Sequence, residues 1–314
     1  MKKKKHIICC GESLFDLIVK KNEKTGDLVL EAHAGGSATN TAIILAHLGL
    51  PSVLISRLGV GSMSSALVEI LSKQGVETSH IIRDKRVHAP LAFAHVDKKG
   101  NSTYQFYEYD APYKKPGKTK LKALFRDTAV LHTGSFFSYS DRFFPLIRDL
   151  LKLAKEEDVF VTYDPNWRAP KIPDKRNARS RIKKILPFVD LLKLSETDAV
   201  CVTGAKSLDG AIKRIEQYLK GGLIVTLGEK GSFYWDGKKK LRQSAFRVRV
   251  VDTIGAGDSF TAGLIHRYCS AGKDVFWEEM KENLRYASAL SSLSCTGRGA
   301  TEGLKDPRRA RKFL

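Results

Sequence analysis

The sequence predicts an α/β fold, in which helices flank a doubly wound, mainly parallel sheet that carries a small β lid. Short apolar runs alternate along the chain with segments of helical apolar spacing, from residue 7 almost to the C-terminus. The runs do not alternate polar with apolar residues, as is typical of parallel strands that helices cover on both faces. The length of 314 residues fits a single domain over 1–314.

The predicted elements follow one another in the order strand, helix, strand. Apolar runs bounded by turn residues predict strands at 7–10, 14–19, 52–58, 129–132, 159–163, 191–194, 223–227 and 246–251. Apolar residues three or four positions apart predict helices at 39–48, 66–74, 141–157, 178–186, 208–219, 260–270 and 283–294. This order winds a parallel sheet with helices on both faces.

Two stretches, about 17–33 and 89–112, break this order, because polar and apolar residues alternate in them without helical spacing. We expect them to form strands outside the main sheet, as a lid inserted over the ends of the parallel strands. Such a lid would exclude water from a site beneath it. A second copy of the chain can pack on the exposed edge of the lid, which would give a homodimer.

The composition is that of a globular protein, with 42% hydrophobic and 28% charged residues. The longest apolar runs, such as 42–50, are far shorter than a membrane-spanning helix, so no membrane partner is expected. The basic N-terminus precedes an apolar stretch of only 7–10, which is too short for a signal peptide. Five cysteines without metal-binding spacing favour reduced thiols. We therefore expect a cytoplasmic protein.

The chain is strongly basic, with 54 Lys and Arg against 34 Asp and Glu, a formal net charge of +20. This surplus favours attraction to phosphates, from nucleotides to nucleic acid. Its clusters lie at 2–5, 238–240 and 308–312, which are the two termini and one predicted hairpin turn. Because no aromatic residues are interleaved with them, a solvated basic surface is favoured over a nucleic-acid site.

The segment 251–260, VDTIGAGDSF, joins a predicted strand to a predicted helix. Gly255 and Gly257 let backbone N–H groups converge at the start of the helix, where an anion such as phosphate fits. Asp258 would lie beside that phosphate, where a group is needed to accept the proton of an attacking hydroxyl. The alternative is a plain turn that Asp258 caps.

This segment closely resembles the C-terminal signature of the ribokinase-like, PfkB-type carbohydrate kinases. The resemblance implies an ATP-dependent sugar kinase in which Asp258 is the catalytic base. It also implies that the amides of Gly255, Ala256 and Gly257 form the anion hole. Sugar and ATP would then be the small-molecule partners of the protein.

The N-terminal region carries the second part of the resemblance. The segment 35–40, GGSATN, is similar to the GGxxxN element of the family. This similarity implies that Gly35 and Gly36 let the sugar approach the backbone and that Asn40 binds its hydroxyls. Asp16 matches the early sugar-binding aspartate, and a carboxylate accepts hydrogen bonds from vicinal hydroxyls. The alternative for 35–40 is a loop that leads into a helix.

Two segments at strand ends, HTGS at 132–135 and YDPNWR at 163–168, resemble the fructokinase branch of the family. Ligands of open α/β sheets bind at such strand ends. Arg168 is a candidate clamp on the transferring phosphoryl group. Alternatively, Arg168 is one more surface arginine, and Asp164 and Asn166 only stabilise a turn.

The nucleotide side is expected at two further elements. TLGEKG at 226–231 is similar to the TLGxxG element of the family, which implies that Thr226, Gly228 and Gly231 contact ATP, together with Gly255 and Gly257. The NxxE element that organises Mg²⁺ through water reads SxxD at 195–198, which implies Ser195 near the nucleotide and Asp198 near the metal. Asp252 and Ile254 occupy positions where relatives hold K⁺.

Two departures bear on the substrate. Relatives carry the pattern GxDxxG at the positions that correspond to 59–64. In this chain Gly61 replaces the aspartate and Ser64 replaces the last glycine, and this change bears on substrate affinity. The segment 106–112 lacks the arginine-containing pattern expected of fructokinases. We expect fructose as acceptor, and we leave open ribose, 2-keto-3-deoxygluconate or a nucleoside. An inactive pseudokinase with a nucleic-acid-binding basic surface is a more distant alternative.

Overall fold

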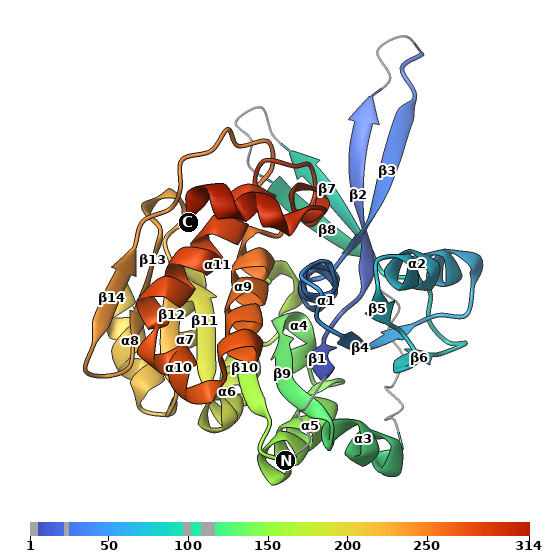
Figure 1. Ribbon diagram of the computed structural model, residues 1–314. Helices are drawn as coiled ribbons and strands as arrows, with labels where there is room; N and C mark the ends of the chain where they lie inside the picture. Colours follow the sequence, from blue (N-terminus) through green and yellow to red (C-terminus); the bar gives the residue numbers. More distant parts are fainter. Residues whose placement is uncertain (1–5, 22–24, 97–101, 108–116) are drawn as a thin grey trace.

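A mainly parallel sheet forms the centre of the protein, as the computed structural model shows (Figure 1). The structure describes residues 6–21, 25–96, 102–107 and 117–314. Within them, the strand order is β14-β13-β12-β11-β10-β9-β1-β4-β5, with β6 beside β4. The strands are β1 (His6–Cys10), β4 (Ser52–Leu58), β5 (Val76–Glu77), β6 (Ile81–Arg83), β9 (Thr128–Gly134), β10 (Phe160–Asp164), β11 (Leu191–Ser195), β12 (Gly222–Thr226), β13 (Ser232–Trp235) and β14 (Lys240–Gln243).

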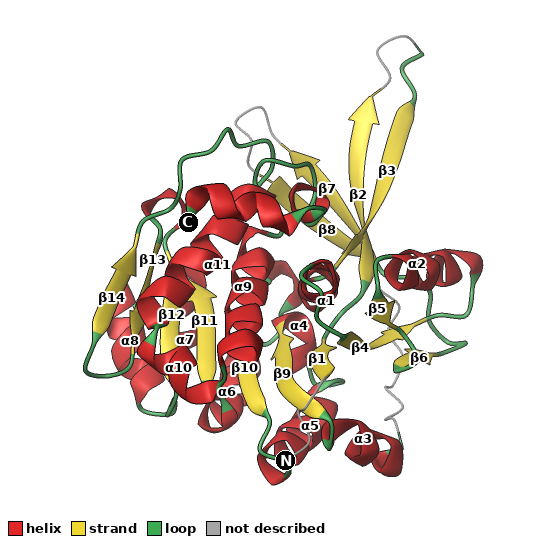
Figure 2. Cartoon of the chain, in the orientation of Figure 1, coloured by secondary structure: helices red, strands yellow, loops and turns green. Residues whose placement is uncertain are grey.

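Helices cover both faces of this sheet (Figure 2). Successive residues of β1 explain why the strands are apolar throughout, since side chains of a strand point alternately to opposite faces. Ile7 and Cys9 pack in one core with α1, α9 and α11, and Ile8 and Cys10 pack in the other with α5 and α6. These helices are α1 (Ser37–His47), α5 (Phe144–Glu156), α6 (Lys175–Ile185), α9 (Ala256–Ala271) and α11 (Met280–Ser294).

The remaining helices fill in the two layers and the sheet edge. They are α2 (Ser62–Lys73), α3 (Lys118–Phe125), α4 (Ser135–Tyr139), α7 (Glu196–Thr203), α8 (Leu208–Glu216) and α10 (Lys273–Glu278). None of the described helices is both long and apolar enough to cross a membrane.

A separate four-stranded sheet has the order β3-β2-β7-β8 and matches the predicted lid. Its strands are β2 (Leu14–Lys21), β3 (Leu28–Gly35), β7 (Leu91–Val96) and β8 (Ser102–Tyr107). The β2–β3 hairpin projects away from the main sheet (Figure 1). The last part of the predicted lid, 108–112, lies outside the described residues.

The doubly wound fold class is confirmed, whereas the strand predicted at 246–251 is wrong and several helix ends differ from the predicted ones by three or four residues. The predicted strand 246–251 is irregular, although Phe246, Val248 and Val250 alternate with arginines. An alternating segment becomes a strand only where a neighbouring strand supplies backbone hydrogen bonds. This segment is not paired in a sheet, and the side chain of Val250 is 59% exposed. The second helix starts at Ser62 rather than residue 66.

Candidate active site

The predicted site residues gather around one cavity of about 650 Å³ at the carboxyl ends of the parallel strands. Its walls come from the start of β2, the start of α1, the ends of β10, β11 and β12, the lid strand β8 and the first turn of α9. Most of the predicted residues line it, namely Asp16, Gly36, Asn40, Arg168, Ser195, Asp198, Thr226, Gly228, Ile254, Gly255, Gly257 and Asp258.

Four predicted residues do not line the cavity. Gly35, Ala256 and Asp252 each adjoin a segment that does. Gly231 lies in the turn between β12 and β13, where a Cβ atom would be 2.0 Å from the carbonyl oxygen of Gln243. This close approach gives Gly231 a role in the turn rather than in the cavity wall.

The carboxylate of Asp258 is the most firmly held group in the cavity. Its Oδ1 accepts a 2.6 Å hydrogen bond from the Ser37 hydroxyl, and its Oδ2 accepts a 2.8 Å bond from the Asn40 amide. Burial raises the pKa of Asp258, whereas the hydrogen bonds from Ser37 and Asn40 act to lower it. A raised pKa makes this carboxylate a stronger proton acceptor than an exposed aspartate.

The first turn of α9 offers unpaired backbone donors beside this carboxylate. The amides of Ala256 and Ser259 donate to the carbonyls of Thr253 and Gly255, at 3.3 and 2.8 Å. Within the described part of the chain, the amides of Gly257 and Asp258 have no hydrogen-bond acceptor. An anion in the cavity can therefore accept from two backbone N–H groups at a helix N-terminus.

Asp16 lies on the opposite, lid side of the cavity. A Cβ atom on Gly35 would be 2.1 Å from Oδ2 of Asp16, so glycine is required there for the carboxylate to take its position. The pKa of Asp16 is raised to about 7, mainly by burial; Arg168 acts to lower it, and the Asp258 carboxylate acts to raise it. The cavity thus brings the carboxylate of Asp16 from β2 within electrostatic range of the Asp258 carboxylate from α9.

Two buried acceptor atoms near Asp16 lack a partner within the described structure. They are Oδ1 of Asn40 and Oε2 of Glu12, and both residues line the cavity. A buried acceptor without a donor is unfavourable unless a ligand or water supplies one. These atoms therefore suit a ligand with several hydroxyl groups.

In the turn after β10, Asp164 and Asn166 both stabilise the turn and line the cavity. Asp164 Oδ1 accepts the amide of Asn166 at 3.0 Å, so the turn-stabilising hydrogen bond exists. Both residues nevertheless line the cavity, as does the half-buried Arg168. The other carboxylate oxygen of Asp164 contacts the Lys193 ammonium at 2.6 Å.

At the end of β11, Ser195 caps α7 by accepting the amide of Asp198 at 3.0 Å. Asp198 Oδ1 accepts the amide of Trp167 at 3.2 Å. Burial and the nearby Asp164 carboxylate raise the pKa of Asp198, while the Ser195 hydroxyl acts to lower it. In the described residues, no group of three or more His, Cys, Asp or Glu is arranged to hold a metal ion.

Asp252 connects the segment before α9 with the loop at Gly299. Its Oδ1 accepts the amide of Ile254 at 3.0 Å, and its Oδ2 accepts the amide of Gly299 at 2.8 Å. The segment that contains Asp252 and Ile254 is therefore in direct contact with the loop at Gly299.

The residues that depart from the family pattern, Gly61 and Ser64, lie away from the cavity lining. Gly61 is the N-cap residue of α2 and makes no side-chain cap, while Ser64 is buried in the first turn. The change therefore affects the start of a helix rather than the described cavity wall.

The sequence analysis did not single out several cavity residues, namely Glu12, Ser37, Phe106, Lys171 and Lys193. Lys193 had a usable signal, because a lysine inside the apolar strand 191–194 must be buried. Phe106 and Lys171 had none, since they reach the cavity only through the packing of the lid and of the segment after β10.

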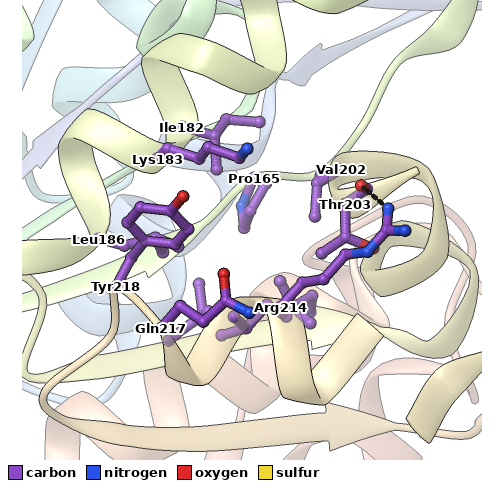
Figure 3. A pocket seen from close by; sticks show the side chains of 12 residues that line it. Pro165, Ile182, Lys183, Leu186, Val202, Thr203, Arg214, Gln217 and Tyr218 are labelled. Atoms are coloured by element: carbon purple, nitrogen blue, oxygen red, sulfur yellow. Dashed lines mark hydrogen bonds between the residues drawn. The ribbon is translucent and has the colours of Figure 1, made fainter. Parts of the chain in front are cut away.

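A second cavity, of about 240 Å³, lies between α6, α7, α8 and β11 (Figure 3). Its walls are mainly aliphatic, with Lys183, Arg214 and Gln217 among its polar lining residues. Arg214 donates to the carbonyl of Thr203 at 2.9 Å. Among the described residues that line this cavity there is no carboxylate.

The fold and the larger cavity define an α/β protein with an anion site and a buried carboxylate at the sheet ends. The family model "pfkB family carbohydrate kinase" matches residues 4–307. The chain is 32% identical to "Probable fructokinase-5" of Arabidopsis thaliana, over 98% of this chain and 97% of that protein. It is 31% identical to "Fructokinase-2" of Solanum lycopersicum, over 95% and 92%. The protein belongs to the pfkB family of carbohydrate kinases.

Solved structures share the fold across the whole chain. The fructokinase with bound ATP from Xylella fastidiosa superposes with a TM-score of 0.85 at 24% identity, covering 98% of each chain. The Vibrio cholerae O395 fructokinase, in its fructose, ADP and calcium ion bound form, gives 0.85 at 20% identity, covering 99% of each. These structures show the shared fold, and the family with its similar fructokinases identifies an ATP-dependent sugar kinase.

Proposed function

We propose that this kinase transfers the γ-phosphoryl group of ATP to a primary hydroxyl of fructose. The observation that carries the proposal is the Asp258 carboxylate, held by Ser37 and Asn40 beside unpaired amides of α9. Relatives at 31–32% identity that bear fructokinase names support fructose as the acceptor.

In the proposed reaction, Asp258 accepts the proton of the attacking hydroxyl. The hydroxyl oxygen forms a bond to the γ-phosphorus while the bond from that phosphorus to the bridging β,γ-oxygen breaks, and ADP leaves. Because the pKa of Asp258 is raised by burial, proton transfer to it is easier than to an exposed aspartate. The bonds from Ser37 and Asn40 fix the carboxylate so that little reorganisation accompanies the transfer.

The anion hole stabilises the negative charge that spreads over the transferred group. We assign it to the segment Gly255, Ala256 and Gly257, with the unpaired amides of Gly257 and Asp258 as its donors. Arg168 adds a guanidinium, which can bind two phosphate oxygens at once. Neutral amides and one arginine thus act at the reacting centre.

The sugar binds on the side of the cavity formed by the lid and α1. Asp16 and the unpartnered Oδ1 of Asn40 accept hydrogen bonds from sugar hydroxyls. Gly35 leaves room for the Asp16 carboxylate, and Gly36, with φ of 99°, leaves room for the carbonyl of Glu12. The lid strands would then exclude water, which would otherwise compete as the phosphoryl acceptor.

The nucleotide binds on the opposite side, along Ser195, Thr226 and Gly228, with Gly231 shaping the turn behind them. Mg²⁺ would enter with ATP, since the described residues offer Asp198 but no three-residue metal cluster. When bound, Mg²⁺ neutralises charge on the phosphates. Asp198 would hold it through water, and the linked loops of Asp252 and Ile254 would hold K⁺.

Turnover of a panel of acceptors tests the proposal directly. Formation of ADP is followed with fructose, ribose, 2-keto-3-deoxygluconate and nucleosides at saturating ATP. We expect fructose to give the highest kcat/KM. A higher value with another acceptor would overturn fructose but retain the kinase chemistry. No turnover with any of them, by folded protein that binds ATP, would overturn the proposed reaction.

The lid also supports a proposed homodimer. Leu28, Val29 and Leu30 on the edge strand β3 are 69%, 46% and 48% exposed, and a row of exposed apolar residues on a sheet edge favours association. Leu30→Arg is expected to give a monomer in sedimentation experiments. Val250→Arg, at an exposed valine outside the lid, is the matched control and should leave the dimer intact. A monomeric parent protein would refute the proposal.

A reducing compartment such as the cytoplasm fits the cysteines. All five are free thiols, and Cys9 and Cys10 are fully buried in β1. Fluorescence microscopy of the tagged chain in its native cell tests this localisation.

A further inference from the structure

Lys193 is a buried cation within the catalytic cavity. It lies in the middle of β11, where Leu192 and Leu194 point into the opposite core. Lys193 itself is 6% exposed and lines the cavity. Its Nζ atom contacts Oδ2 of Asp164 at 2.6 Å, and Asp164 is only 3% exposed. A buried ion pair of this kind contributes little net stability compared with apolar residues of similar size.

The ammonium lies directly against the anion-binding turn of α9. A Cβ atom on Gly257 would be 2.7 Å from Nζ of Lys193, so any other residue at 257 would displace the ammonium. The unpaired amides of Gly257 and Asp258 belong to the same turn. A fixed positive charge and two N–H donors therefore converge at one edge of the cavity.

Lys193 is charged, and its bond to Asp164 does not use all of its N–H donors. Burial acts to lower the pKa of Lys193, but Asp164, and more weakly Asp258 and Asp198, raise it, so the group remains charged. An ammonium has three N–H donors, and a single 2.6 Å bond to Asp164 uses one of them. At least one donor remains for an anion that enters the cavity.

We propose that Lys193 is a catalytic residue, whose ammonium is held by Asp164 and donates to the phosphoryl group in transfer beside the Gly257 amide. Lys193 forms and breaks no covalent bond, and it stays protonated throughout. Asp164 is the positioning residue that keeps Nζ at the anion turn. This proposal rests on the proposed function, because it assigns Lys193 to the same phosphoryl transfer.

A structural explanation competes with this one. Lys193 can serve only to neutralise Asp164, whose carboxylate is buried and whose other oxygen holds the turn at Asn166. Lys193→Met alone does not separate the two, because it also leaves an unpaired buried carboxylate. The double variant Asp164→Asn, Lys193→Met removes both charges and keeps an oxygen for the Asn166 amide.

The test compares kcat and thermal unfolding across the parent, both single variants and the double variant. We expect kcat of Lys193→Met to fall by about 10²–10³-fold, with KM for each substrate changed far less, because the contact is strongest in the transition state. The double variant should regain the melting temperature of the parent while kcat stays low. Recovery of kcat in the double variant to the level of the parent would overturn the proposal.

An acceptor-independent measurement separates this proposal from the sugar assignment. ADP with aluminium fluoride mimics the transferring phosphoryl group, and its binding needs no knowledge of the acceptor. Lys193→Met should weaken that complex by about 10²-fold while leaving ADP affinity close to that of the parent. Equal weakening of both would overturn the proposal. Lys213→Met, at an exposed lysine of α8, is the matched control and should change neither.

Discussion

Asn40 donates a 2.8 Å hydrogen bond to the carboxylate of Asp258, across 218 positions of the chain. The bond joins the first turns of α1 and α9, which pack side by side on one face of the sheet. It orients the proposed base from the sugar side of the cavity. The amide of Asn40 thereby links substrate recognition to proton transfer.

Asp258→Asn should lower kcat by about 10²–10⁴-fold, because an amide cannot accept the hydroxyl proton. The variant keeps the local bonds, since its oxygen can accept from Asn40 and its amide can donate to Ser37. ATP affinity, measured by calorimetry, should therefore change little. Unaltered kcat in stopped-time assays would refute the assignment of the base.

The pKa of about 7 for Asp16 predicts an acid limb in kcat/KM for the sugar. Below that pH the carboxyl group takes up a proton and loses its capacity to accept from hydroxyls, so kcat/KM should fall about tenfold per pH unit. Arg168 opposes this protonation, whereas Asp258, Asp252 and Glu12 favour it. Initial rates at low sugar and saturating ATP, from about pH 5 to 9, give the profile.

Asp16→Asn is the control for that profile. Its kcat/KM should be about 10–100-fold lower at neutral pH, as expected when a hydrogen bond to a charged group is lost, and the limb near pH 7 should vanish. A limb that persists unchanged in the variant would assign the titration to another group.

Arg168→Met should lower kcat by about 10²-fold through loss of charge at the transferred group. Arg168→Lys keeps the charge but not the two-pronged geometry, so it should recover only part of the loss. Steady-state kinetics with both variants measure the difference. Full activity of the methionine variant would place Arg168 outside the reacting centre.

Val202→Ile should stabilise the protein by filling part of the 240 Å³ cavity (Figure 3). Val202 is 4% exposed, and one added methylene contributes about 0.8 kcal/mol when it is buried without strain. Denaturant unfolding measures the gain, and kcat should not change because this cavity has no carboxylate. A lower unfolding free energy would mean that the added methylene is strained there.

Much of the fold and of the site followed from the sequence. The parallel strands and both ends of the cleft were predicted, because apolar runs and the two glycine motifs are local signals. The segment 246–251 was predicted wrongly, because alternation alone does not reveal whether a neighbouring strand is present. The roles assigned to Asp258 and Asn40 remain predictions, although the structure brings the two residues together.

Lys193 shows where sequence reasoning stops, because its place in an apolar strand indicates burial but does not reveal its partners. It is one of 54 basic residues in a strongly basic chain, so its charge carries little information by itself. The role proposed for Lys193 rests on its close approach to Gly257, 64 positions further along, and on the burial of Asp164. Such a triad depends on how three separate segments pack.

The distance along the chain between Asn40 and Asp258 has a consequence for biosynthesis. A nascent chain that has emerged only as far as β14 contains the lid and most of the residues proposed to bind sugar and nucleotide, but it lacks the proposed base and the turn at the start of α9. Because synthesis runs from the N-terminus, catalytic competence arises only when α9 docks against α1. Incomplete chains on the ribosome therefore lack both the proposed base and the helices α9 and α11, which complete one helical layer of the core.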